Sequence, residues 1–464
     1  MDQIKFGTDG WRAIIADTYT VENVRRVAEG TALWMKSKGF RKVVIGHDCR
    51  FGGKLFLQEA CRVLGGHEIE CFYAEGYVST PMVSLGVLQQ KADIGIVITA
   101  SHNPPDYNGF KLKSSYGGPT IPSDIEQVES LIPDKEILPK QDFSTLNSIG
   151  ILKKVDLEQA YFDHVISHFN LQLIQEKTNV AFDAMYGAGQ RIMTRLFPKL
   201  KSFHCSWNPG FDGTAPEPIS KNLTDITAFL KENPDQYTAI ANDGDADRVC
   251  MIDPNGNMVD SHHILLLLVH YLAGYKKMTG KIVVSFSVTN KLKKLADYYG
   301  LELVITKIGF KYIAEYMISE DVLVAGEESG GLAIKGHIPE RDGVWIGITI
   351  LEFMAATGKT INELIQDVYQ ITGSFAYDRL DLHLSDDQMS KVKQRLANDK
   401  FDQWGDFHCI NFESLDGQKY YFEDDAWLMF RASGTEPVLR IYAQGKDMDV
   451  VKNIHQAARK ELGL

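Results

Sequence analysis

Three stretches of this 464-residue chain repeat one pattern, and that repetition constrains the fold more than any other feature. In each stretch a β-branched run is followed by a helical segment, and a later strand ends in a polar loop. The opening runs lie at residues 43–45, 180–182 and 282–284, and the polar loops lie at 101–104, 243–247 and 326–331. Such strands alternating with helices indicate buried, mostly parallel sheets, whose ligands bind beyond the carboxyl ends of the strands. Each polar loop is therefore a candidate site.

The end of the chain has a different pattern. After about Thr372 there is a charged helical segment at 386–398, a hairpin-like turn at 416–417, and strands at 426–430 and 438–443. This predicts a smaller C-terminal α+β domain. The predicted fold class is thus α/β, with three related α/β domains of mixed, mostly parallel sheets followed by this α+β domain. The predicted domains are 1–145, 150–253, 254–370 and 373–464.

The charge of the chain limits its partners. The formal net charge is -12, from 49 Lys and Arg against 61 Asp and Glu, and no basic run tracks a nucleic-acid backbone. We therefore expect no nucleic-acid partner. An acidic protein that binds anionic substrates must gather its Arg and Lys side chains in one cleft.

Targeting signals and cysteines predict a cytoplasmic protein without a membrane partner. The N-terminal residues MDQIKFGTDGWR lack the basic segment and apolar core of a signal peptide. The longest apolar stretch, 264–269, is much shorter than the roughly 20 residues that span a bilayer. The six cysteines form no CxxC pair, which favours a reducing compartment and buried thiols.

Ser101 is a candidate nucleophile because it follows the predicted strand at 94–99 directly. His102, Asn103 and two prolines come next, and such a stiff turn would present the hydroxyl. Ser, Asn and Pro are also ordinary turn residues, so a purely structural loop is the alternative. The GxSxG motif of acyl hydrolases is absent, since Thr99 and Asn103 occupy its glycine positions.

Three aspartates form a candidate metal site. Asp243, Asp245 and Asp247 alternate with small residues, which lets the loop fold three carboxylates around one hard cation. A calcium-binding EF-hand loop does not fit, because Arg248 stands at its glycine position and Pro254 at its last ligand position. A solvated acidic turn is the alternative. We predict magnesium, with the oxygen of a phosphorylated Ser101 as a further ligand.

Two further loops have the chemistry of sugar-phosphate binding. Glu327, Glu328 and Ser329 stand among glycines, and their acceptors and hydroxyl suit sugar hydroxyls. A later loop has a cation, two hydroxyls and a glycine that could hold a phosphate: Arg431, Ser433, Gly434 and Thr435. A flexible turn and a polar hairpin loop are the respective alternatives.

Taken together, five motifs resemble those of the α-D-phosphohexomutase family, which includes phosphoglucomutases, phosphomannomutases and phosphoglucosamine mutases. The motifs are FGTDGWR at 6–12, TASHNPPDYNGFK at 99–111, DGDADR at 243–248, GEESGG at 326–331 and RASGTEP at 431–437. They occur in family order and span nearly the whole chain. The resemblance implies three related α/β domains and a fourth domain that closes over a central cleft.

The resemblance also implies roles for particular residues. It implies phosphoserine at Ser101, with Mg²⁺ on that residue and on the three aspartates. His102 adjoins the serine as a further catalytic candidate, and Lys111 matches a family lysine implicated in proton transfer. Other matches are Arg12 and Arg248 near the phosphoserine, Glu327 and Ser329 on the sugar O3 and O4, Lys311 on the substrate, and Arg431, Ser433, Gly434 and Thr435 on the non-reacting phosphate.

The implied reaction interconverts hexose 1-phosphate and hexose 6-phosphate. Phosphoserine gives its phosphoryl group to the sugar phosphate and forms a hexose 1,6-bisphosphate. This intermediate reorients in the cleft without leaving, and its other phosphate returns to Ser101. Gly331 stands where many phosphomannomutase/phosphoglucomutases have histidine, and the segments 309–311, 327–329 and 337–343 resemble glucose-type phosphoglucomutases. Glucose phosphate is therefore the predicted substrate. The alternatives are mannose or glucosamine phosphate and, more remotely, a non-catalytic sugar-phosphate sensor. We expect a monomer or a weak homo-oligomer.

Overall fold

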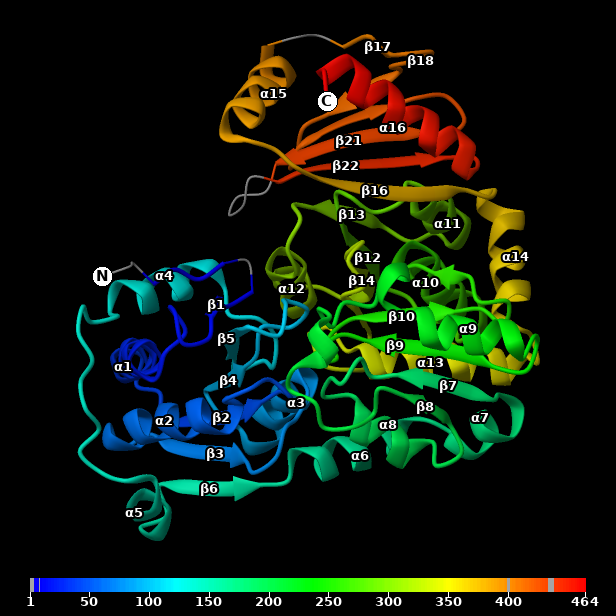
Figure 1. Ribbon diagram of the computed structural model, residues 1–464. Coiled ribbons are helices and arrows are strands. Elements are labelled where there is room, and N and C mark those ends of the chain that lie inside the picture. Colours follow the sequence, from blue (N-terminus) through cyan, green and yellow to red (C-terminus); the bar gives the residue numbers. More distant parts are fainter. Residues whose placement is uncertain (1–3, 8, 399–400, 433–437) are drawn as a thin grey trace.

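The computed structural model describes residues 4–7, 9–398, 401–432 and 438–464, which form four main sheets with their helices (Figure 1). Three of the sheets belong to α/β units, and the C-terminal sheet belongs to an α+β unit. The predicted fold class is confirmed. The four units surround a cleft that receives residues from each of them.

The first sheet places the serine loop. Its order is β1-β5-β4-β2-β3-β6, in which β4, β2, β3 and β6 are parallel and β1 and β5 form an antiparallel edge. The strands are Trp11–Ile14 (β1), Lys42–His47 (β2), Glu70–Ala74 (β3), Ile94–Ile98 (β4), Tyr107–Ser114 (β5) and Leu152–Val155 (β6). The helices are Val21–Ser37 (α1), Gly53–Gly66 (α2), Thr80–Gln90 (α3), Pro122–Ser130 (α4) and Phe143–Ser148 (α5). Every residue of β4 is buried, as its sequence IGIVI predicts for a central strand.

The second sheet places the aspartate loop between two of its strands. Its order is β11-β10-β9-β7-β8, with β9, β7 and β8 parallel and β10 and β11 antiparallel. The strands are Val180–Asp183 (β7), Lys201–Phe203 (β8), Thr238–Asn242 (β9), Val249–Ile252 (β10) and Met258–Val259 (β11). The helices are Leu157–His168 (α6), Leu171–Lys177 (α7), Gln190–Leu196 (α8) and Thr224–Glu232 (α9), with short 3-10 turns at Phe211–Gly213 and Ser220–Asn222.

The third sheet ends in the GEESGG loop. Its order is β13-β12-β14-β15, and only the β14–β15 pair is antiparallel. The strands are Lys281–Ser285 (β12), Leu303–Thr306 (β13), Val322–Gly326 (β14) and Leu332–Ile334 (β15). The helices are Ser261–Val269 (α10), continued by a π-helical turn at His270–Tyr275, then Lys291–Tyr299 (α11), Phe310–Ser319 (α12), Gly343–Thr357 (α13) and Ile361–Thr372 (α14). Gly358 ends α13 in the left-handed conformation, and a capping box of Thr360 and Glu363 begins α14.

The C-terminal sheet is antiparallel throughout, in the order β16-β22-β21-β20-β19. Its strands are Ala376–His383 (β16), Asn411–Glu413 (β19), Gln418–Tyr421 (β20), Trp427–Ala432 (β21) and Val438–Gly445 (β22). A small hairpin of Gln403–Trp404 (β17) and Phe407–His408 (β18) and two helices, Asp386–Asn398 (α15) and Met448–Leu462 (α16), complete the unit. It lies at the top of Figure 1, in orange and red.

The sheets suggest how the chain divides into domains. We propose the ranges 1–145, 150–253, 254–370 and 373–464 as the four domains. Two strands extend the preceding sheet beyond these ranges, because β6 pairs with β3 and β11 pairs with β10. The first strand after each of these two boundaries is therefore hydrogen-bonded to the sheet of the preceding domain.

Within the described residues, no single helix is both long enough and apolar enough to cross a bilayer. In the same part of the chain, only α13 and α14 taken together meet the length and composition required, and they are bent by 87°. Most of α13 is buried inside the protein.

Candidate active site

One cleft of about 630 Å³ receives side chains from all four units. Its cations are Lys5, Arg12, Arg248, Lys311, Arg341, Arg379, Arg431 and Arg440. Its carboxylates are Asp9, Glu217, Glu327, Glu328 and Asp381. Cations thus outnumber carboxylates in the cleft, although the whole chain has a formal charge of -12. The prediction that a few Arg and Lys side chains gather in one place is confirmed, and the cleft suits an anionic ligand.

Ser101 is held in an unusual backbone conformation beyond the end of β4. Its φ is +52°, in the left-handed region that residues other than glycine seldom adopt. Its backbone N–H donates to Thr99 Oγ1 at 2.9 Å. Its side-chain Oγ donates to Asp243 Oδ2 at 2.8 Å and lies 3.3 Å from His102 Nδ1. The structure therefore brings together the serine and the aspartate loop, which the sequence spacing left open.

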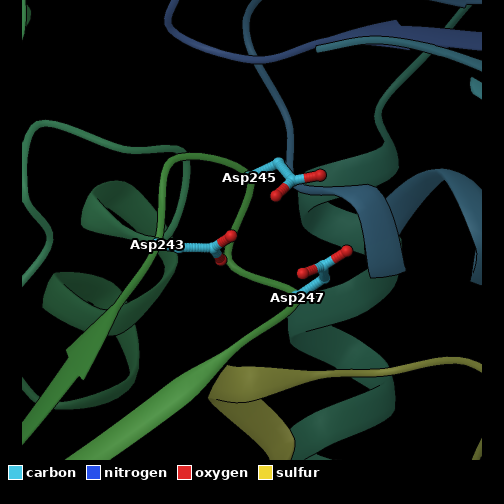
Figure 2. Close-up of side chains that lie close together, drawn as sticks. All are labelled: Asp243, Asp245 and Asp247. Atoms are coloured by element: carbon cyan, nitrogen blue, oxygen red, sulfur yellow. The ribbon is translucent and has the colours of Figure 1, made fainter. Parts of the chain in front are cut away.

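The three aspartates lie in the turn between β9 and β10, and Figure 2 shows their carboxylates gathered around a common space. All three are buried, and one ligand oxygen from each lies within 4.8 Å of the others. Oδ1 of Asp245 and Oδ1 of Asp247 have no hydrogen-bond partner among the described residues. Burial raises the pKa of Asp243 well above its usual value, and Asp245 and Asp247 raise it further. Unpartnered buried oxygens that repel one another fit a hard divalent cation such as Mg²⁺.

Lys111, on β5, lies fully buried against the same loop. Its Nζ lies 2.8 Å from Asp245 Oδ2, 3.2 Å from Asp247 Oδ2 and 2.8 Å from Asp9 Oδ2. Burial lowers the pKa of Lys111, but the three carboxylates outweigh it and raise the pKa above its usual value. A divalent cation on these aspartates would offset that attraction.

Arg12, His102 and Arg248 lie beside the serine on the cleft wall. Arg12 Nη1 donates to Asn103 Oδ1 at 2.7 Å, and the Arg248 backbone N–H donates to Asp243 Oδ1 at 3.1 Å. Burial lowers the pKa of His102 well below its usual value, and the nearby arginines lower it further. Arg248 Nε also lies 4.0 Å from Asp243 Oδ2, the oxygen to which Ser101 Oγ donates. Both cations therefore lie near the place where a phosphoryl group on the serine would need neutralising charge.

The GEESGG loop presents two carboxylates with different partners. Glu327 is buried and accepts a hydrogen bond from the Gly309 N–H at 2.8 Å, and burial raises its pKa. Glu328 Oε1 instead accepts from Arg379 Nη1 at 2.7 Å, on the C-terminal unit. Ser329 and Lys311 also line the cleft, close to Glu327 in the same wall. The predicted sugar-binding residues therefore lie together.

The predicted phosphate loop is described only in part. Arg431 lines the cleft, and its Nε lies 3.4 Å from Asp416 Oδ2. Ser433, Gly434 and Thr435 lie outside the described residues.

Sequence reasoning missed several side chains around the aspartates. Arg341 Nη2 bonds Asp247 Oδ2 at 2.7 Å and also pairs with Asp9, and Thr80 Oγ1 donates to Asp245 Oδ2 at 2.5 Å. Asp9 and Arg341 stand inside segments already noted for other reasons, so their charge was a usable signal. Thr80 is an ordinary residue at a helix start, and nothing in its sequence context marks it.

Models of the phosphoglucomutase/phosphomannomutase family match the chain in four segments. Alpha/beta/alpha domain I matches residues 3–137, domain II 159–256, domain III 260–371 and the C-terminal domain 385–461. A phosphoglucosamine mutase of Methanococcus maripaludis is 30% identical over 97% of this chain and 96% of its own length. A phosphoglucomutase/phosphomannomutase of Thermococcus kodakarensis is 29% identical over 95% of this chain and 94% of its own length.

A solved structure agrees with these matches. A provisionally assigned phosphomannomutase of Thermus thermophilus superposes with a TM-score of 0.87 and 33% identity, covering 100% of both chains. The family models together span well over half of the residues, and they match in the order of the four sheets. The chain therefore belongs to the phosphoglucomutase/phosphomannomutase family of phosphohexomutases, which are intramolecular phosphotransferases.

Proposed function

We propose that this protein interconverts glucose 1-phosphate and glucose 6-phosphate through a phosphoserine at Ser101. The observation that carries the proposal is the 2.8 Å contact between Ser101 Oγ and Asp243 Oδ2 at the edge of the aspartate cluster. A phosphoryl group on this oxygen would lie next to the aspartate cluster, near Arg248, which lies 4.0 Å from Asp243, and near Arg12, which bonds Asn103. Phosphoryl transfer depends mostly on such charge and on alignment.

In this proposal Ser101, Asp243, Asp245 and Asp247 hold Mg²⁺, which when bound would neutralise charge on the phosphoryl group. Arg12 and Arg248 bind the reacting phosphate, His102 supports Ser101, and Lys111 takes or gives the proton of the sugar hydroxyl. Glu327, Ser329 and Lys311 bind the sugar. Arg431 with Ser433, Gly434 and Thr435 holds the non-reacting phosphate, so that a bound hexose 1,6-bisphosphate is the intermediate.

Glucose is the proposed sugar because of the partners of the cleft carboxylates. A glucosamine phosphate carries a 2-ammonium group, which would favour a carboxylate without a cation. Glu328 and Asp381 both pair with Arg379, Asp9 pairs with Lys111, and Glu217 lies 3.9 Å from Arg248. Four of the carboxylates thus already face cations. The fifth, Glu327, lies in the field of Arg341 and Arg248, which lower its pKa against the larger effect of burial. None of the described cleft carboxylates is therefore left without a nearby cation for a 2-ammonium group, and Glu327 can accept from a sugar hydroxyl.

Glucosamine phosphate is the second candidate, because the Methanococcus relative at 30% identity is a phosphoglucosamine mutase. Coupled assays should compare kcat/KM for glucose, mannose and glucosamine 1-phosphates on the purified protein. A dominant rate with the amino sugar would reject glucose and leave the phosphoserine proposal intact.

Intact-mass spectrometry followed by peptide mapping tests the phosphoserine itself. We expect one added phosphate on the peptide that contains Ser101, lost on mixing with a sugar monophosphate and restored by glucose 1,6-bisphosphate. A phosphate mapped elsewhere would reject the mechanism. We also propose a cytoplasmic location and a monomer or weak homo-oligomer, and size-exclusion chromatography with light scattering can test the oligomeric state.

A further inference from the structure

A buried arginine holds the loop that carries Ser101. Arg50 is 1% exposed and directs both terminal nitrogens of its guanidinium group at backbone carbonyls. Its Nη2 donates to the carbonyls of Ser101 at 2.7 Å and Asn103 at 2.6 Å. Its Nη1 donates to the carbonyls of Pro104 at 2.7 Å and Tyr107 at 3.0 Å. One side chain thus fixes four carbonyls along the serine loop.

The same arginine is tied to the other side of Ser101 through two side chains. Arg50 Nε lies 3.3 Å from Asp48 Oδ2, and that oxygen accepts a hydrogen bond from Thr99 Oγ1 at 2.6 Å. Thr99 Oγ1 in turn accepts from the Ser101 N–H at 2.9 Å. Both backbone polar groups of Ser101 are therefore held by a connected set of buried side chains. Such a set can maintain a φ of +52°, which a free loop would leave.

The chemistry of arginine suits this task. A planar guanidinium group offers donors at fixed angles, whereas a lysine ammonium is a single point charge on a flexible stem. Burying a cation is costly unless dipoles and an opposite charge compensate for the lost water. Here the four carbonyl dipoles and the Asp48 carboxylate compensate for it, so the buried Arg50 depends on both.

The second domain covers this arrangement. The ring of Phe211 lies over the guanidinium group, with its centroid 5.1 Å from the Arg50 Cζ atom. Phe211 is buried and has a φ of +47°, which is strained for a bulky residue. A Cβ atom on Gly244 would lie 2.4 Å from the Ser101 carbonyl oxygen, so the aspartate loop passes directly beside the serine backbone. Arg50 therefore sets the serine against the metal-binding loop across a domain boundary.

We propose that Arg50 is a positioning residue for phosphoryl transfer, which it serves by fixing the Ser101 backbone with Asp48 and Thr99 as its supports. The inference rests on the proposed role of Ser101. In-line transfer depends on placing the donor oxygen accurately, and an error of about 1 Å lowers the rate by about 100-fold. A lysine at position 50 would keep the charge and lose the simultaneous hold on four carbonyls.

The test compares Arg50→Lys with a matched control, Arg26→Lys. Arg26 is also a buried arginine of the first domain, but it donates to Asn23 Oδ1 on α1 at 2.8 Å and to the Pro133 carbonyl, beyond α4, at 2.7 Å. Both variants should lose thermal stability. Only Arg50→Lys should lose kcat, by about 100-fold, with KM changed by less than about threefold.

The same loss should appear in a single turnover of enzyme phosphorylated at Ser101, with rates normalised to the phosphoserine content found by intact mass. Equal kcat values for the two variants would overturn the inference. A wild-type protein with neither mutase turnover nor phosphoserine would instead reject the proposed function.

A second pair of variants decides the matter if Arg50→Lys does not fold. Thr99→Val keeps the side-chain shape and removes the acceptor of the Ser101 N–H. Its control is Thr31→Val, a buried threonine on α1 whose hydroxyl donates to the Val27 carbonyl at 2.8 Å. We expect kcat of Thr99→Val to fall about tenfold, because the Ser101 backbone would lose one of its two supports and the serine oxygen would be less accurately placed. A kcat for Thr99→Val equal to that of Thr31→Val would overturn the inference.

Discussion

The three α/β domains share one large hydrophobic cluster in addition to clusters of their own, whereas most of the C-terminal core is separate. One buried cluster runs from Val44 in the first domain to Phe375 at the start of the C-terminal domain, and it includes residues of the first three sheets. The C-terminal cluster is separate, and a small group joins it to the third domain: Phe286, Trp427, Met429 and Tyr442. The serine and aspartate loops thus belong to domains joined by one hydrophobic cluster, and Arg431 belongs to a unit whose core is mostly separate.

Burial follows the same division. Ser101 and the three aspartates are at most 1% exposed, whereas the side chains of Arg379 and Arg431 on the C-terminal wall are 28% and 21% exposed. Groups fixed in a common core can hold an aligned reaction geometry, and groups on a separately folded unit can close on a ligand. Changes on the first side should therefore lower kcat, and changes on the second should mainly raise KM.

The largest effect is expected when the same substitution is made at two serines of the α/β domains, one in the buried serine loop and one in the GEESGG loop of the third domain. Ser101→Ala removes the phosphate acceptor and should lower mutase turnover by roughly 10⁴-fold or more. Ser329→Ala removes one sugar contact and should lower kcat/KM by about tenfold, as expected for a single hydrogen bond. Coupled steady-state assays measure both. Similar losses in the two variants would mean that the buried serine has no special role.

A smaller effect is expected at the cation site. Asp243→Asn removes a charge from the aspartate cluster and should raise the Mg²⁺ concentration for half-maximal activity by about 100-fold. Asp253→Asn is the matched control, because Asp253 is buried in the same sheet region and accepts bonds from neutral groups of Asn255, Asn257 and Asn362. Magnesium titrations of the two variants that coincide would count against the site.

The aspartate cluster shows what sequence could predict. Strand patterns placed Ser101 and Asp243 at the carboxyl ends of β4 and β9. Ligands of α/β sheets bind beyond these strand ends, so the pattern alone predicted that both residues lie on the ligand-binding side of their sheets. The pattern could not tell that the two loops meet, because the contact spans 142 residues and depends on how two domains pack. The resemblance of motifs, and not the periodicity, supplied their pairing.

The supports of the site were harder to predict. Asp48 and Arg50 follow β2 just as Ser101 follows β4, but a single charged pair after a strand is common in surface loops, so neither residue was predicted to belong to the site. Thr80 gave no signal, since its bond to Asp245 arises from the packing of α3 against the second domain. Side chains that act through tertiary contacts leave no local pattern in the sequence.

The next prediction concerns the ion pair that crosses the cleft from the C-terminal domain. Arg379 on β16 bonds Glu328 at 2.7 Å, so Arg379→Ala should weaken closure and raise KM by about tenfold, with kcat changed by less than about threefold. Glu328→Gln should act similarly. A double variant whose KM equals that of either single variant would show that the pair acts as a unit, whereas full additivity would contradict it.

The contact between the C-terminal and third domains includes a buried lysine that bonds backbone carbonyls. Lys419 on β20 is 2% exposed, and its Nζ donates to the Phe286 carbonyl at 2.9 Å, in the third domain. Its Nζ also lies 4.0 Å from the centroid of the Trp427 ring. Burial lowers the pKa of Lys419 from 10.5 to about 7, against the opposing effect of Glu413.

Because this pKa is lowered on folding, the unfolded protein binds the extra proton between about pH 7 and 10.5, and stability should rise with pH in that window. The expected slope is about 1.4 kcal/mol per pH unit for one proton. Lys419→Met should remove that slope while changing kcat at neutral pH by less than about threefold.

Lys291→Met is the control, since Lys291 is also buried but pairs with Asp425 at 2.7 Å. This variant should weaken the interface without removing the slope. Denaturant unfolding of the three proteins from pH 7 to 9 gives the comparison. A slope that survives in Lys419→Met would show that groups other than this lysine cause the pH dependence.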